Sequence, residues 1–178
     1  MSLELIRETG VSPQTSVVDV GGGASNLVDR LVEAGFSDLT VLDVSEVALN
    51  GARERLSEDR GVTWLNEDVL SWKPARAFGL WHDRAVFHFF VTESERKRYL
   101  DTLHAALRSG GHLIIATFAP DGPESCSGLP VERYSPEDLC ALIGPGFTLE
   151  SARAELHTTP AGTLQPFTWI AGRLRPPS

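Results

Sequence analysis

The sequence of 178 residues contains only two cysteines, Cys126 and Cys140. Their spacing matches no metal-binding motif, and one pair provides no disulfide framework. No apolar run approaches the roughly 20 residues that a membrane-spanning helix needs. The first ten residues also lack a basic segment followed by an apolar one, as a secretory signal would have. We therefore expect a cytoplasmic protein with no membrane association and no metal centre.

Basic residues are also scarce, since 16 lysines and arginines face 24 acids and the net charge is −8. Proteins that bind nucleic acid usually present a basic face that neutralises phosphates. The one dense basic run, residues 96–98, follows Glu93 and Glu95 on an expected helix, where mixed charge is typical of a solvated face. The composition therefore disfavours a DNA or RNA partner.

Short apolar segments alternate along the chain with segments of helical spacing. A chain of this length is expected to form one domain. The strands are expected near residues 17–20, 39–42, 62–65, 78–82, 112–118, 147–155 and 168–174. A capping box, Thr92 with Glu95, predicts the start of one helix, and Ser135 before Pro136 predicts another.

This alternation predicts a doubly wound α/β fold, because parallel strands need crossover helices. The last two strands lie too close together for such a helix, so residues 147–174 are expected to form an antiparallel hairpin. Five strand–helix units followed by such a hairpin are typical of one variant of the α/β fold. The order of the seven strands expected from that variant is 3-2-1-4-5-7-6. Within residues 1–178 we expect a cofactor-binding core at 16–118, with lid segments at 1–15 and 119–143.

The most informative stretch is residues 17–27, VVDVGGGASNL, where a short strand runs into a glycine-rich turn. Such a turn between strand and helix predicts a nucleotide-like cofactor at the carboxyl edge of the sheet. The dinucleotide fingerprint G-x-G-x-x-G fails, since Asn26 stands in its last place. Asp19 lies just before the turn, where its charge would repel a pyrophosphate but suit an ammonium group.

Across residues 16–174 the pattern resembles the class I S-adenosylmethionine (SAM)-dependent methyltransferases. Asp19 to Ser25 is similar to the first motif of that family, with Ser25 in place of its last glycine. Asp43 ends the second expected strand, 22 residues after Gly21, and Asp68 follows the third.

The resemblance implies a role for each acid. Asp19 and the turn would hold the methionine end of SAM, Asp43 would accept hydrogen bonds from the ribose hydroxyls, and Asp68 would accept one from the adenine amino group. The backbone amide of Val69 would bind the adenine ring. The full set of cofactor-binding residues expected in this way is Asp19, Gly21, Gly22, Gly23, Ser25, Asp43, Val44, Asp68, Val69 and Asp83.

The acceptor is expected at the end of the fourth strand, beside the transferable methyl group. His88 is the first candidate for a general base, because an unperturbed histidine titrates near neutral pH, and Asp83 is the second. His82, Asp83 and His88 could instead bind a metal, but their spacing is weak evidence for that. The residues expected to contact the acceptor are Phe87, His88, Cys126 and His157.

Several functions remain open. A small-molecule acceptor is preferred, because two short lid segments could enclose one. Protein lysine methylation is the alternative within the same chemistry, and a SAM-binding module without catalysis is an alternative of another class. A small nicotinamide-dependent oxidoreductase is disfavoured, since no Tyr-x-x-x-Lys pair occurs in the chain. The protein is expected to be a monomer or a homodimer.

Overall fold

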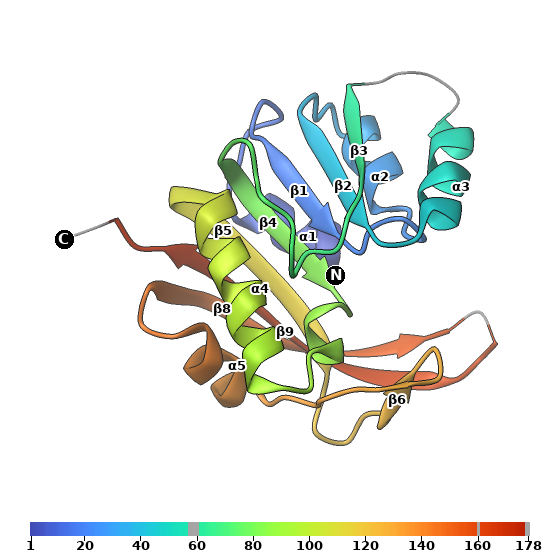
Figure 1. Cartoon of the computed structure of the whole chain (residues 1–178), viewed down its shortest axis with the longest axis vertical. Coiled ribbons are helices and arrows are strands. Elements are labelled where there is room, and N and C mark those ends of the chain that lie inside the picture. Colours follow the sequence, from blue (N-terminus) through green and yellow to red (C-terminus); the bar gives the residue numbers. More distant parts are fainter. Residues whose placement is uncertain (57–60, 160, 177–178) are drawn as a thin grey trace.

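The structure is a computed structural model that describes residues 1–56, 61–159 and 161–176 (Figure 1). The helices are α1 (Ser2–Glu8), α2 (Leu27–Glu33), α3 (Glu46–Leu56), the 3-10 helix η1 (Phe87–Phe89), α4 (Glu93–Ala106) and α5 (Pro136–Ile143). The strands are β1 (Val17–Val20), β2 (Leu39–Asp43), β3 (Val62–Asn66), β4 (Phe78–Arg84), β5 (Leu107–Phe118), β6 (Ser125–Cys126), β7 (Leu129–Pro130), β8 (Phe147–Thr158) and β9 (Leu164–Leu174).

Seven strands form one sheet in the order β3-β2-β1-β4-β5-β9-β8, and β6 pairs with β7 separately. The first five strands along the chain, β1 to β5, are parallel, whereas β9 runs antiparallel to both β5 and β8. Since β8 and β9 are the sixth and seventh strands of this sheet, the expected order 3-2-1-4-5-7-6 is confirmed. The sheet brings the carboxyl ends of β1, β2 and β4 side by side.

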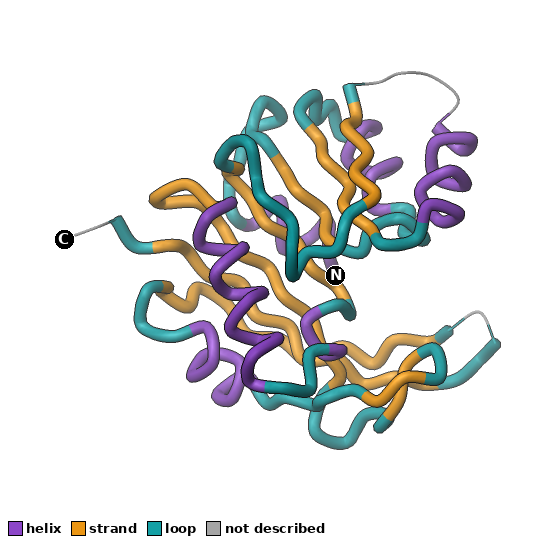
Figure 2. The backbone as a smooth tube through the Cα atoms, in the orientation of Figure 1, coloured by secondary structure: helices purple, strands orange, loops and turns teal. Residues whose placement is uncertain are grey.

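Helices cover both faces of the sheet, as the expected doubly wound fold requires (Figure 2). Helices α1, α2 and α3 pack on one face through residues such as Leu5, Leu31 and Leu49. Helices α4 and α5 pack on the other through Leu103 and Leu139. In the central strands, alternate residues enter these two cores, because successive side chains of a strand point to opposite faces.

Both helix starts predicted from the sequence are present. The side chain of Thr92 accepts a hydrogen bond from the amide of Glu95, and the Glu95 carboxylate accepts one from the amide of Thr92, which completes a capping box for α4. Ser135 and Asp138 form the same arrangement at α5, with Pro136 in the first turn. These side chains satisfy amides that the helix cannot pair within itself.

The boundaries differ from expectation at three places. Helix α4 ends at Ala106 and β5 begins at Leu107, which pairs with Phe78, whereas the sequence predicted that this strand would start near residue 112. The C-terminal hairpin is longer than expected at its turn, with Thr158 paired to Leu164. The expected lid segment 119–143 contains the small β6–β7 hairpin.

Among the described residues, no helix is long and apolar enough to cross a bilayer.

Candidate functional site

The glycine turn follows β1 and is fixed to both neighbouring strands. Val20, the last residue of β1, lies opposite Leu42 of β2 and Asp83 of β4. The amide of Gly21 then donates a hydrogen bond to the carbonyl of Leu42 at 2.7 Å. The turn therefore lies at the carboxyl edge of the sheet, where the sequence analysis placed it.

Each glycine of the turn is required by close packing against another part of the protein. A β-carbon at Gly21, whose φ is +70°, would lie 2.1 Å from the side chain of Val86. A β-carbon at Gly22 would lie 2.3 Å from Oδ2 of Asp19, and one at Gly23 would lie 2.9 Å from Oδ2 of Asp43. The three glycines thus bring the turn against two carboxylates and the segment after β4.

Asp43 ends β2 and holds the glycine turn in place. Its Oδ2 accepts a hydrogen bond from the amide of Gly23 at 2.9 Å, and its Oδ1 accepts one from the amide of Ser45 at 2.8 Å. The amide side chain of Asn66 donates to the Asp43 carbonyl at 3.0 Å. Each carboxylate oxygen can accept a second hydrogen bond.

A cavity of about 400 Å³, here called the Asp43 cavity, opens beside the turn. Its walls bring together Gly21, Asp43, Val44 and Val69, all of which the sequence predicted as cofactor-binding. The remaining lining residues are Val20, Ala24, Leu42, Ser45, Ala48, Glu67, Ala85, Val86, Phe89 and Ser127. Four strand ends therefore share one cavity with the tip of the β6–β7 hairpin.

Asp68 is exposed and does not line this cavity, although its neighbours Glu67 and Val69 do. Its Oδ1 accepts a hydrogen bond from the amide of Leu70 at 2.9 Å, which closes a local turn. That contact leaves Oδ2 of Asp68 for other partners, and the predicted role toward an adenine amino group stays a prediction.

Asp19 is buried beneath the turn and belongs to a polar chain that reaches the N-terminal helix. Nδ1 of His82 lies 2.7 Å from Oδ1 of Asp19, and Nε2 of His82 lies 3.0 Å from Oγ of Ser2. Asp19 and His82 face each other across β1 and β4. Oδ2 of Asp19 is also buried, and it has no hydrogen-bond partner among the described residues.

Asp83 is fully buried at the end of β4, with both carboxylate oxygens used inside the protein. The hydroxyl of Tyr99 donates to Oδ2 at 2.6 Å, and the amides of Val86 and Phe87 also donate to this carboxylate. Burial raises the pKa of Asp83 to about 6, although these hydrogen bonds oppose the shift. Asp83 does not line the Asp43 cavity, and its predicted roles toward the cofactor and in catalysis stay predictions.

Phe87 and His88, which the sequence analysis expected to contact the acceptor, are both buried, and that contact stays a prediction. Ala85 adopts a positive φ of 69°, and the chain then enters η1, which directs both side chains into the core. The His88 ring packs against Phe89 and Phe118, with ring centroids 4.7 Å apart in each case. Burial lowers the pKa of His88 to about 4. Its catalytic role stays a prediction, and it would require the ring to become accessible.

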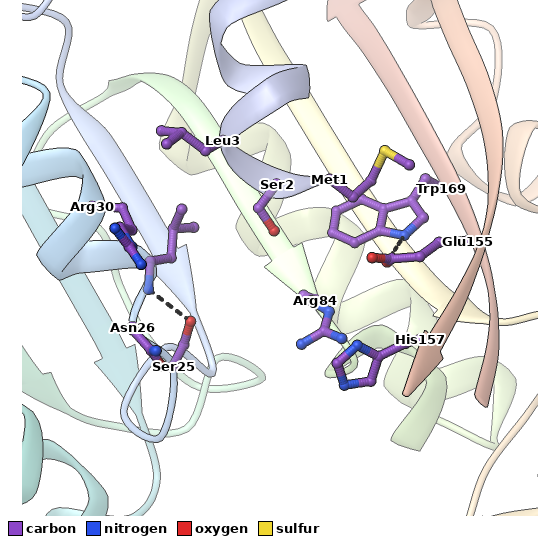
Figure 3. Close-up of a pocket in the computed structure, with 11 residues that line it drawn as sticks. Met1, Ser2, Leu3, Ser25, Asn26, Arg30, Arg84, Glu155, His157 and Trp169 are labelled. Carbon is purple, nitrogen blue, oxygen red and sulfur yellow. Dashed lines mark hydrogen bonds between the residues drawn. The ribbon is translucent and has the colours of Figure 1, made fainter. Parts of the chain in front are cut away.

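A second cavity, of about 300 Å³, lies on the other side of the glycine turn and is here called the Arg84 cavity (Figure 3). Ser25 and His157 line it, which brings together one residue predicted for the cofactor and one predicted for the acceptor. Arg84 and Trp169 also line it, and the sequence analysis missed both. The position of Arg84 directly after Asp83 was an available signal, whereas nothing in the sequence indicated Trp169.

Cys126 is partly buried in β6, and its sulfur lies 4.0 Å from the hydroxyl of Ser127. Ser127, not Cys126, lines the Asp43 cavity. Among residues 1–56, 61–159 and 161–176, no three histidines, cysteines or acids are grouped as metal ligands.

Known proteins resemble this chain in sequence and in fold. The family model described as a methyltransferase domain matches residues 17–111. Over 148 residues the chain is 28% identical to EEF1A lysine methyltransferase 2 of Danio rerio. This match covers 78% of this chain and 57% of that protein. It is 24% identical to malonyl-[acyl-carrier protein] O-methyltransferase 1 of Ilyobacter polytropus, over 61% of this chain and 40% of that protein. The chain thus spans little more than half the length of these relatives, or less.

Solved structures share the fold. The N-methyltransferase NodS of Bradyrhizobium japonicum superposes with a TM-score of 0.78 at 17% identity, over 98% of this chain and 94% of that chain. A second structure is the Burkholderia thailandensis 1,6-didemethyltoxoflavin-N1-methyltransferase with bound 1,6-didemethyltoxoflavin and S-adenosylhomocysteine. It superposes with a TM-score of 0.77 at 20% identity, over 98% of this chain and 76% of that chain.

Proposed function

This chain belongs to the class I SAM-dependent methyltransferase family, and on that premise we propose that it transfers a methyl group from SAM to a small-molecule acceptor. One observation carries the proposal. The Asp43 cavity is lined by both the glycine turn and the acid that ends β2, and Asp43 is bonded directly to that turn. The same edge of the sheet carries a second cavity next to the first.

The residues of the Asp43 cavity fit SAM. Asp43 has acceptor capacity left for the two ribose hydroxyls. Val44 and Val69 offer apolar walls for the adenine ring, and Val44 is exposed beside the acid. Asp19 lies beneath the turn and does not line this cavity, but its buried Oδ2 has no hydrogen-bond partner among the described residues and would accept one from the ammonium group. SAM would supply the activated methyl group as a sulfonium.

The protein contributes binding and alignment to such a reaction. Holding two reactants in the productive geometry can account for several kcal/mol of the barrier, about 7 or more in favourable cases. The Asp83 carboxylate holds the segment after β4 through the amides of Val86 and Phe87, and the Val86 side chain packs on Gly21. Phe89 and Ser127 also line the Asp43 cavity.

The second cavity is open to solvent and has room for a small acceptor. A volume of about 300 Å³ is at the lower end of small-ligand pockets. The Burkholderia thailandensis structure, whose fold this chain shares, has 1,6-didemethyltoxoflavin and S-adenosylhomocysteine bound. Its low identity makes it support for the fold, and the acceptor class remains our proposal.

Protein lysine methylation is a second candidate, because the Danio rerio relative at 28% identity is a lysine methyltransferase. In that case the acceptor side chain would have to enter the same edge from outside. The two candidates differ in the size of the molecule that becomes methylated.

A turnover assay separates them. The purified protein and SAM are incubated with the ultrafiltrate or with the retained protein of one cell lysate, and S-adenosylhomocysteine formation is measured. We expect product with the ultrafiltrate, and none with Asp43→Ala. Product with retained protein alone would contradict the small-molecule proposal. Cofactor binding without product in either fraction would favour a non-catalytic SAM-binding module.

A further inference from the structure

The Arg84 cavity holds cationic side chains in a protein with a net charge of −8. Four ionisable side chains line it, namely Arg30, Arg84, Glu155 and His157. With histidine neutral, two arginines and one glutamate give this cavity a formal charge of +1. A local positive field in an acidic protein favours an anionic ligand.

Arg84 is the arginine of this cavity that forms no ion pair with a carboxylate of the described residues. Arg30 pairs with Glu33 at 3.4 Å, and the Glu155 carboxylate accepts a hydrogen bond from the Trp169 indole at 2.8 Å. The Arg84 guanidinium instead lies over the ring of Phe167, 4.9 Å from its centroid, and no carboxylate of the described residues lies within 4 Å of it. A ring face orients the guanidinium without neutralising it.

The two cavities meet at two pairs of consecutive residues. Ala24 lines the Asp43 cavity and Ser25 lines the Arg84 cavity. In the second pair, Ala85 lines the Asp43 cavity and Arg84 lines the Arg84 cavity. Both cavities are therefore walled by the same two segments, the glycine turn and the end of β4. In Figure 3, Arg84 and His157 lie close together and face Ser25 and Asn26 across the cavity.

From this geometry we propose that the methyl acceptor carries a carboxylate, which Arg84 binds with His157 and Asn26 beside it. The proposal rests on the proposed function and adds the chemical class of the substrate. The planar guanidinium matches a carboxylate with two parallel hydrogen bonds, which a lysine in that place would not provide. The apolar part of the wall is formed by Met1, Leu3, Leu27 and Trp169.

A carboxylate in this cavity has a second possible source, which is the methionine part of the cofactor. The two sources are separable by affinity. If Arg84 bound the cofactor, Arg84→Met would weaken binding of S-adenosylhomocysteine but not of 5′-methylthioadenosine, which lacks the carboxylate. If Arg84 binds the acceptor, the affinities for both nucleosides stay as in the wild type.

The test uses matched probes on protein saturated with S-adenosylhomocysteine. The pairs are 4-hydroxybenzoate with 4-hydroxybenzamide, 3-mercaptopropionate with 3-mercaptopropionamide, and glycine with glycinamide. Binding is measured by calorimetry or by ligand-observed NMR. We expect the wild type to prefer the carboxylate in at least one pair, and Arg84→Met to weaken that binding about tenfold to a hundredfold. Arg84→Lys should retain part of the preference.

Lys97→Met serves as the control for net charge, because Lys97 pairs with Asp101 on the exposed face of α4. It should leave every probe affinity unchanged. The proposal is overturned if the wild type shows no preference for any carboxylate, if Arg84→Met keeps the preference, or if Arg84→Met weakens only S-adenosylhomocysteine. Failure of the wild type to bind S-adenosylhomocysteine at all would instead contradict the proposed function, and this is measured first.

Discussion

At the scale of single residues, two buried ionisable groups near the site have pKa values shifted by burial. The two shifts have opposite effects on the free energy of unfolding as the pH falls. The pKa of His88 falls to about 4 and that of Asp83 rises to about 6, both through burial. Between pH 4 and 6.5 the unfolded chain binds more protons at His88 than the folded protein does, so His88 lowers stability as the pH falls. Asp83 binds its proton more readily in the folded protein, so its contribution increases stability as the pH falls from 6 to 4.

Replacing His88 should therefore expose the Asp83 contribution. We expect His88→Phe to become more stable relative to the wild type as the pH falls from 7.5 to 4.5, by roughly 2–3 kcal/mol. Urea unfolding at the two pH values measures this difference, and any constant effect of the new side chain cancels. An equal difference at both pH values would show that His88 keeps an ordinary pKa.

At the scale of elements, helix α4 is joined to strand β4 by a buried hydrogen-bonded chain. The Trp81 indole donates to the Tyr99 hydroxyl at 2.9 Å, and that hydroxyl donates to Asp83 at 2.6 Å. The same carboxylate fixes the start of η1. The position of the segment that packs on Gly21 therefore depends on a contact with a helix on the other side of β4.

Removing the Tyr99 hydroxyl should be costly, because the buried Trp81 indole loses its partner and the buried Asp83 carboxylate keeps only the two backbone amides as donors. We expect Tyr99→Phe to lower the free energy of unfolding by about 2–4 kcal/mol at pH 7. Tyr134→Phe is a matched control, since the Tyr134 hydroxyl is buried without a hydrogen-bond partner among the described residues. Chemical denaturation of both variants checks this, and a similar small change in each would contradict the role of the chain.

At the scale of the whole molecule, the sequence alone predicted the sheet order and the edge that carries the site. Strand and helix periodicities, with glycine turns and caps, are local signals, and parallel topology follows from their alternation. The direction of the side chains after Asp83 could not be predicted in this way. It depends on the positive φ of Ala85, which buries Phe87 and His88 and leaves Arg84 at the cavity. The role of Trp169 depends on how β9 lies beside β5, which is a long-range contact.

The central claim is that the edge formed by β1, β2 and β4 binds the SAM cofactor through Asp43. Calorimetry with S-adenosylhomocysteine tests it most directly. We predict micromolar binding by the wild type and by Asp101→Ala, a variant of an exposed acid on α4, and binding about tenfold to a hundredfold weaker by Asp43→Asn. Thermal unfolding must show that all three proteins are folded. Binding of NAD in place of S-adenosylhomocysteine, or an unchanged affinity in Asp43→Asn, would contradict the account.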